Sequence, residues 1–300
     1  MVDVQGFLIE DRPVVAFFIG AYAYTWVVSA PSAFMEPSWP AAILIYLGSF
    51  GPPISAAAVT WLRGDDVRAW ADQITDWRVG WQWWVIALGL PIVAAGVITL
   101  GILVVGGPVD LRQELPSPLL FVGIFLFAMV LSGGLNEEPG WRGFAQPRLN
   151  EQYGALRGSL LIGVVWAGWH LPYFFIPVAP HSGFPLVNQI GWFGGILTLS
   201  VMLAWVYNST GSVLIPMALH AMANTADVVI PLAPDQILVE GVIDEGAVGV
   251  VTAVHVGVYG VIALVIIAVY GRRKLARGEV PGAADVGGRI GGGDSISTDD

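Results

Sequence analysis

The sequence predicts an all-α, polytopic membrane protein with about eight transmembrane helices and a polar site inside the helix bundle. Of its 300 residues, 55% are hydrophobic and only 12% are charged, and its mean hydropathy is +0.70. Soluble domains have about 25% charged residues, so this composition excludes that class. The apolar runs are about 18 to 23 residues long and do not alternate with period two, which favours helices over a membrane barrel.

The apolar runs and the breakers between them define the expected spans. These are residues 13–30, 41–62, 83–105, 118–138, 157–176, 185–207, 212–232 and 248–270. The sequence Gly51-Pro52-Pro53 predicts a kink inside the second span rather than its end. Residues 63–84 mix charges with tryptophans, which predicts an interfacial amphipathic helix.

One domain is expected, a transmembrane helical domain over residues 1–270. Residues 271–300 are rich in Gly, Asp and Ser, which predicts a disordered, acidic cytoplasmic tail. The single lysine, twelve arginines and 23 acidic residues also favour the hypothesis of a halophilic source, because high salt screens self-repulsion of an acidic surface.

The distribution of arginine and lysine predicts the orientation of the chain. Basic residues gather in three regions, the 2–3 connection, the 4–5 connection and the flank after the last span, whereas the 1–2, 5–6 and 7–8 connections have none. Basic loops stay on the cytoplasmic side. With an even number of spans, we expect a multi-pass protein of the cell membrane with both termini in the cytoplasm.

Two adjacent glutamates, Glu137 and Glu138, stand at the end of an apolar run. Carboxylates near membrane depth face a protein interior or a water-filled cavity and mark functional sites. If the helix continues through Pro139, Glu138 can pair with Arg142 four residues later. Glu137 then points about 100° away and is a candidate general base. The alternative is a structural ion pair at a helix end.

Two histidines and an amide lie inside other apolar spans. His170 follows Trp166 by four residues, and His220 precedes Asn224 by four, so each pair shares a helix face. An acid, two imidazoles and an amide are the parts of a hydrolytic site: a base for water, a partner that orients it and donors for an oxyanion. A lone membrane histidine can instead form an interhelical hydrogen bond.

No cofactor is expected, although zinc remains possible. Glu137, His170 and His220 are a known kind of zinc ligand set, but the sequence has no H-E-x-x-H, so spacing does not indicate a metal. The absence of cysteine excludes thiolate ligands and a cysteine nucleophile. We expect His181 to be exposed in a loop and His255 to have a packing or hydrogen-bonding role.

The site motifs together resemble the CPBP family of intramembrane proteases, which is related to the type II CAAX prenyl endopeptidases and the bacteriocin-immunity proteins. The motifs are Glu137-Glu138-x-x-x-Arg142, Trp166-x-x-x-His170 and His220-x-x-x-Asn224. The resemblance covers about residues 40–270. Two departures are Trp166, where phenylalanine is usual, and Pro139 directly after the glutamates.

This resemblance implies a helical core whose cavity opens toward the cytosol. It also implies that Glu137 and His170 activate the attacking water, while His220 and Asn224 stabilise the oxyanion. The implied supporting residues are Glu138, Arg142 and Trp166. Of the two mechanisms, metal-dependent and metal-free, the resemblance favours the metal-free one.

Three classes of function fit these residues. The first is an intramembrane endopeptidase of the CAAX type, acting on a membrane-associated protein or peptide. The second is a non-catalytic immunity or scaffolding protein that keeps the polar cluster for binding. The third is a proton-coupled transporter, which also uses buried Glu and His, although the internal repeat of many transporters is not visible. Lipid is an expected partner and nucleic acid is not.

Overall fold

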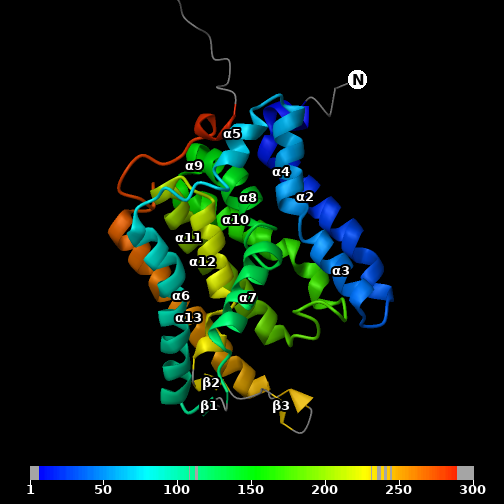
Figure 1. Ribbon diagram of the computed structural model, residues 1–300, viewed down its shortest axis with the longest axis vertical. Helices are drawn as coiled ribbons and strands as arrows, with labels where there is room; N and C mark the ends of the chain where they lie inside the picture. Colours follow the sequence, from blue (N-terminus) through cyan, green and yellow to red (C-terminus); the bar gives the residue numbers. More distant parts are fainter. Residues whose placement is uncertain are drawn as a thin grey trace, which may run out of the picture.

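The computed structural model describes residues 7–107, 109–111, 114–230, 232–234, 238–239, 242–243 and 245–288. Within these ranges the chain is built from helices (Figure 1). They are η1 (Phe7–Asp11), α2 (Pro13–Ser29), η2 (Ala30–Phe34), α3 (Trp39–Gly48), α4 (Gly51–Leu62), α5 (Val67–Asp72), α6 (Trp81–Val104), α7 (Pro118–Leu131), α8 (Glu138–Gly140), η3 (Trp141–Ala145), α9 (Gln146–Tyr153), α10 (Ala155–Trp169), η4 (Leu171–Phe174), α11 (Leu186–Thr210), α12 (Leu214–Ala223), η5 (Ala226–Val229), α13 (Glu245–Tyr270) and η6 (Ala284–Val286).

Short strands accompany the helices in the described residues. They form two antiparallel pairs, β1 (Val109–Leu111) with β2 (Leu232–Pro234), and β3 (Leu238–Val239) with β4 (Val242–Ile243). Both pairs lie at one end of the bundle (Figure 1). The predicted all-helical class is confirmed, because these strands contain only two or three residues each.

Each predicted span contains a helix, but the helices differ in length. Among the described residues, five are long and apolar enough to cross a membrane: Pro13–Phe34, Trp39–Leu62, Trp81–Val104, Leu186–Thr210 and Gly246–Tyr270. The other three, α7, α10 and α12, have 14, 15 and 10 residues. At 1.5 Å per residue they extend about 15 to 22 Å, less than the roughly 30 Å of hydrocarbon. The chain is a multi-pass membrane protein, and a count of eight crossing helices is not confirmed.

The second predicted span bends where Gly51 and two prolines stand. It runs as one span from Trp39 to Leu62, with α3 ending at Gly48 and α4 beginning at Gly51, as the predicted kink requires. A side chain at Gly51 would meet the main-chain oxygen of Ala21 at 2.5 Å, so glycine at this position lets α4 pack closely against α2. The predicted interfacial helix is shorter than expected, because only α5 is helical between α4 and α6.

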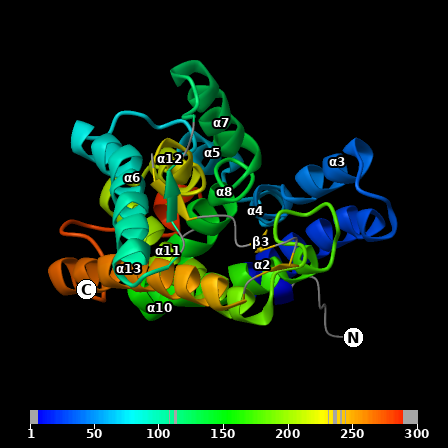
Figure 2. The same ribbon diagram turned by 90° about the horizontal axis from the view of Figure 1, so that it is seen from below.

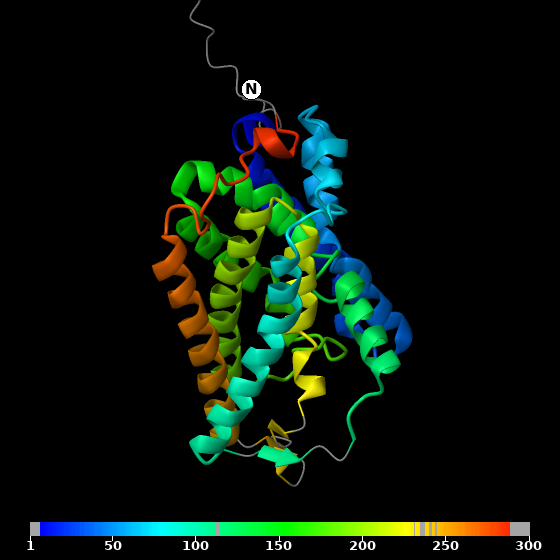
Figure 3. The same ribbon diagram turned by 60° about the vertical axis from the view of Figure 1, so that its left-hand side comes forward.

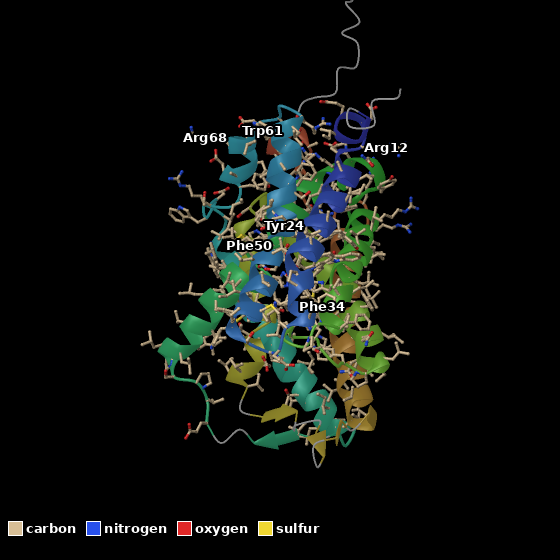
Figure 4. The ribbon with its side chains drawn as sticks, turned by 90° about the vertical axis from the view of Figure 1, so that its right-hand side faces the viewer. Arg12, Tyr24, Phe34, Phe50, Trp61 and Arg68 are labelled. Atoms are coloured by element: carbon tan, nitrogen blue, oxygen red, sulfur yellow. The ribbon has the colours of Figure 1, made fainter. Side chains whose placement is uncertain are left out.

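The basic regions lie at one end of the molecule. Figure 3 shows the N-terminal elements, α5, α9 and the segment after α13 at the end opposite the strands. In Figure 4, Arg12, Trp61 and Arg68 lie near that end, whereas Phe34 lies farther along the bundle. The three regions rich in arginine and lysine therefore face the same side, as the charge count requires. That this side is the cytoplasm stays a prediction.

The helices pack in two groups. Seen from below, α2, α3 and α4 stand to one side of the group that contains α6, α11, α12 and α13 (Figure 2). Large apolar side chains on the outer faces are exposed, including Val93 at 63% on α6 and Leu264 at 66% on α13. Such a surface would be a liability in water and is what contact with lipid requires.

The segment after α13 is more ordered than the sequence suggested. Residues 271–288 pack on the basic end, where Leu275 is fully buried. The N–H of Ala155, at the start of α10, donates to the main-chain oxygen of Arg273 at 2.8 Å. The structure differs here from the predicted disordered tail, because an apolar side chain in the polar segment gives it a place to pack. Residues 289–300 of that tail lie outside the described residues.

Candidate active site

The two glutamates begin a helix rather than end one. Helix α7 stops at Leu131, the chain turns, and a new helix starts at Glu138 with Pro139 in its first turn, a position that proline favours. The condition for the Glu138–Arg142 pair, a helix that continues through Pro139, is met by α8 and η3, although this helix is separate from α7. Asn136 shapes the turn, accepting from the N–H of Gly133 at 2.8 Å while its own amide donates to a serine hydroxyl on the chain before α4.

Glu138 is fully buried and has two partners. The Nε of Arg142 lies 3.5 Å from Glu138 Oε2, so the predicted pair four residues apart is confirmed. His220 Nδ1 lies 2.7 Å from Glu138 Oε1. Because an ionised carboxylate only accepts, Nδ1 donates this bond. The contact fixes the His220 ring and leaves Nε2 facing Gly133, where an added Cβ would lie 2.5 Å away.

Trp166 connects two of the predicted site residues. Its indole Nε1 donates to Glu137 Oε2 at 2.5 Å, and its main-chain oxygen accepts from His170 Nδ1 at 3.0 Å. With Nδ1 donating to a carbonyl, a neutral His170 keeps its Nε2 lone pair as an acceptor. All three residues are buried. Trp166 thus orients Glu137 through its side chain and His170 through its main-chain carbonyl.

A cavity of about 470 Å³ joins the predicted site residues. Its lining includes Glu137, His170, His220 and Asn224, together with Trp166. The amide of Asn224 donates one hydrogen bond to a main-chain oxygen in the turn after α7 at 2.9 Å and retains a second N–H. The supporting residues Glu138 and Arg142 do not line the cavity but lie buried behind it.

The same cavity is lined by all four histidines of the chain. His181 was expected to be exposed in a loop and instead lines the cavity. The packing role expected of His255 is present as a stack on Tyr259, although His255 also lines the cavity. The His181 ring lies 5.7 Å from that of His170 and 4.6 Å from that of Trp192. No spacing in the sequence could have indicated this, because the loop between α10 and α11 and the face of α13 meet only in the fold.

The cavity lies away from the basic end of the bundle. Its lining residues on α11 and α13 come mostly from the N-terminal halves of these helices, next to the strands and the loop before α11. Figure 3 shows that the C-terminal end of α13 lies on the opposite, basic side. The expectation of a cavity that opens toward the cytosol therefore conflicts with a cytoplasmic basic end.

The residues proposed for zinc do not form a ligand set. Among the described residues, no three His, Asp or Glu side chains are placed to hold one metal ion. The Nδ1 atoms of His170 and His220 bond a carbonyl and Glu138, which leaves each Nε2 as the atom that could bind a metal. As placed, Glu137, His170 and His220 do not fit a three-ligand zinc centre.

Known proteins resemble this region of the chain. Residues 118–226 match the family model described as type II CAAX prenyl endopeptidase Rce1-like. This match supports the predicted family. The Rce1-like region contains every predicted site residue from Glu137 to Asn224. A protein named CAAX prenyl protease 2, from Methanococcus maripaludis, is 26% identical over 121 residues, which are 38% of this chain and 44% of that relative. The match thus spans less than half the length of the relative.

Proposed function

We propose that the protein is an intramembrane endopeptidase that hydrolyses a peptide bond in a membrane-associated substrate. The observation that carries the proposal is the double contact of Trp166, which holds Glu137 through its indole and His170 through its carbonyl in one cavity. A polar site beside an apolar cavity is the common form of an active site. The Rce1-like region supports the same class of enzyme.

Glu137 and His170 act on water in this mechanism. Together they take one proton from a water molecule, whose oxygen forms a bond to the carbonyl carbon of the substrate. The carbonyl π bond opens and its oxygen becomes an oxyanion. When the carbon–nitrogen bond breaks, the held proton passes to the leaving amine. Both residues then return to their starting protonation states.

His220 and Asn224 stabilise the oxyanion. The second amide N–H of Asn224 and the Nε2–H of a protonated His220 are the donors, and such donors in a site without bulk water lower the barrier strongly. Glu138 and Arg142 do not touch the substrate. Glu138 holds the His220 ring and balances its positive charge, while Arg142 balances Glu138.

The substrate is proposed to be a protein anchored near the bilayer. The relative from Methanococcus maripaludis carries the name CAAX prenyl protease 2. A CAAX terminus has a prenylated cysteine followed by three residues, and the prenyl chain holds it at the membrane. A farnesylated CAAX peptide is accordingly the first substrate to test. The proposal also includes a location in the cell membrane with both termini in the cytoplasm.

The test is cleavage of a fluorescent farnesylated CAAX peptide by the purified full chain in liposomes. Wild type should release the C-terminal tripeptide, whereas Glu137→Gln and His170→Ala should each lose at least about a hundredfold in kcat, as removal of a general base does. The outer-face variant Leu264→Ala is the control. Full activity of both site variants would reject the mechanism. The non-catalytic alternative would be favoured if wild type cleaved neither this peptide nor any protein that accumulates in a Glu137→Gln strain.

A further inference from the structure

The cavity extends beyond the proposed reacting groups into a space between α11 and α13. We call this space the α11–α13 arm and define it by three polar lining residues and one apolar lining residue. They are Asn188 and Ile196 of α11, and Thr252 and His255 of α13. Helix α13 lies outside the region that matches the Rce1-like family, so the arm has residues that this match does not describe.

Gly191 on α11 lets α13 come close enough to form the arm. A Cβ on Gly191 would overlap the methyl carbon of Thr252, so only glycine permits this approach. One turn later, a Cβ on Gly195 would lie 3.8 Å from the His255 ring. This packing brings two polar side chains of α13, Thr252 and His255, against the cavity.

His255 offers its ring nitrogens to the cavity. Its ring stacks on that of Tyr259, with centroids 4.7 Å apart and planes 8° apart, which fixes its orientation. Among the described residues, no hydrogen bond involves either ring nitrogen of His255. A neutral imidazole has one donor and one acceptor, so a bound molecule can use either.

Asn188 supplies a buried acceptor that lacks a protein partner. Its Oδ1 is shielded from the surface and makes no hydrogen bond with the described residues. A buried polar atom of this kind is costly unless something donates to it. Because Asn188 lines the cavity, an N–H group of a bound molecule is the donor that the site can receive.

The charge of the arm favours an uncharged ligand. Among the described residues, the cavity lining contains no Lys or Arg, and Glu137 is its one acid. An uncharged molecule that both donates and accepts hydrogen bonds matches an amide acceptor, a hydroxyl and an imidazole. The main chain of an extended peptide has this pattern of N–H and C=O groups.

We propose that the α11–α13 arm binds the main chain of the substrate next to the scissile bond. Asn188 Oδ1 accepts from a peptide N–H, and His255 donates to a peptide C=O. The assignment rests on the proposed function and makes both residues determinants of substrate binding rather than of chemistry. In this assignment the cavity has two regions lined by histidine. His170 and His220 take part in the reaction, and His255 positions the main chain of the substrate.

The test uses the full chain in liposomes with the farnesylated CAAX peptide as probe. His255→Phe keeps the stacked ring without nitrogens, and Asn188→Leu keeps the side-chain size without the acceptor. Each should raise KM about three- to tenfold, the effect of one lost hydrogen bond, with kcat within about twofold of wild type. Val261→Ala, on the outer face of the same helix, is the control and should leave both constants unchanged.

A chemical change in the peptide gives a second, independent test. N-methylation of each amide beside the scissile bond in turn should raise KM for wild type at one position, with little further rise for Asn188→Leu at that position. Wild-type KM values in both variants would overturn the assignment. A KM effect reproduced by amidating the C-terminal carboxylate would also overturn it, since the arm would then bind a carboxylate.

Failure of the proposed function is distinguishable from failure of this inference. If wild type does not cleave the peptide, fluorescence anisotropy measures its binding instead. Weaker binding to His255→Phe and Asn188→Leu than to wild type and Val261→Ala would still support the arm. Equal binding to all four proteins, or no binding to any, would overturn it. Thermal unfolding of each variant controls for loss of fold.

Discussion

The indole N–H of Trp166 donates to a carboxylate oxygen of Glu137, and both side chains are buried. The bond fixes one carboxylate oxygen, so the other is the one that can meet water in the cavity. It also explains why a tryptophan suits this position, because phenylalanine has no donor. The contact therefore makes Trp166 a positioning residue for the proposed base.

Trp166→Phe should lower kcat by about ten- to a hundredfold, because a hydrogen bond to a charged group contributes about 1.5 to 3 kcal/mol. The ring remains, so KM should change little. Trp70→Phe is the matched control: Trp70 is also buried and donates to a main-chain oxygen, but it does not line the cavity. Peptide cleavage in liposomes measures both. Equal kcat in the two variants would contradict the role of the indole bond.

Glu138→Gln should destabilise the protein by about 3 to 5 kcal/mol, because it leaves the buried Arg142 without a counter-charge. Adding Arg142→Met should restore much of the stability, which chemical unfolding in detergent measures. Activity should stay low in the double variant, since His220 still lacks its carboxylate. A stable and fully active double variant would show that Glu138 does not orient His220.

Gly133→Ala should abolish most activity. Gly133 has φ of +108°, which favours glycine, and an added Cβ would lie 2.5 Å from His220 Nε2. The ring would be displaced from its place beside Glu138. Gly123→Ala on α7, where no atom lies within 4 Å of the added Cβ, should keep wild-type activity. Comparable activity of the two alanine variants would argue against a role for the His220 position.

Chelation should leave the activity unchanged. The described residues offer no group of three His, Asp or Glu side chains for a metal, so the proposed steps use the side chains of this chain and water. The measurement is peptide cleavage before and after dialysis against a strong chelator. A loss of activity that zinc restores would establish the metal-dependent alternative with Glu137, His170 and His220.

The orientation in the membrane can be measured directly, because the chain contains no cysteine. Arg68 lies at the basic end (Figure 4), and Glu114 is exposed in the segment between β1 and α7. Arg68→Cys and Glu114→Cys therefore report on the two ends of the molecule. A membrane-impermeant maleimide added to intact cells should label Glu114→Cys alone, and permeabilisation should expose Arg68→Cys. The reverse pattern would place the basic end outside and the cavity toward the cytosol.

The sequence alone predicts the helical class, the position of each span and the residues that meet in the cavity. It does so because lipid imposes long apolar runs and makes every interior acid or imidazole conspicuous. Helix lengths were harder to predict, since apolar loops such as the one after His170 read as a continuing span. The bond between Glu138 and His220 was missed because 82 residues separate them, and they become neighbours only in the folded bundle.

Three of the helices around the cavity, α7, α10 and α12, are too short to cross the hydrocarbon by themselves, and they carry or adjoin the Glu137, His170 and His220 positions. A helix of only about 15 to 22 Å is a weak signal for the machinery that inserts helices during synthesis. Its membrane placement depends on neighbours that are already inserted. We therefore expect the five long helices to be inserted first and the polar site to assemble late in biogenesis. If the long helices are inserted first, Glu137 and Glu138 enter a bundle that is already formed and do not face lipid without a partner.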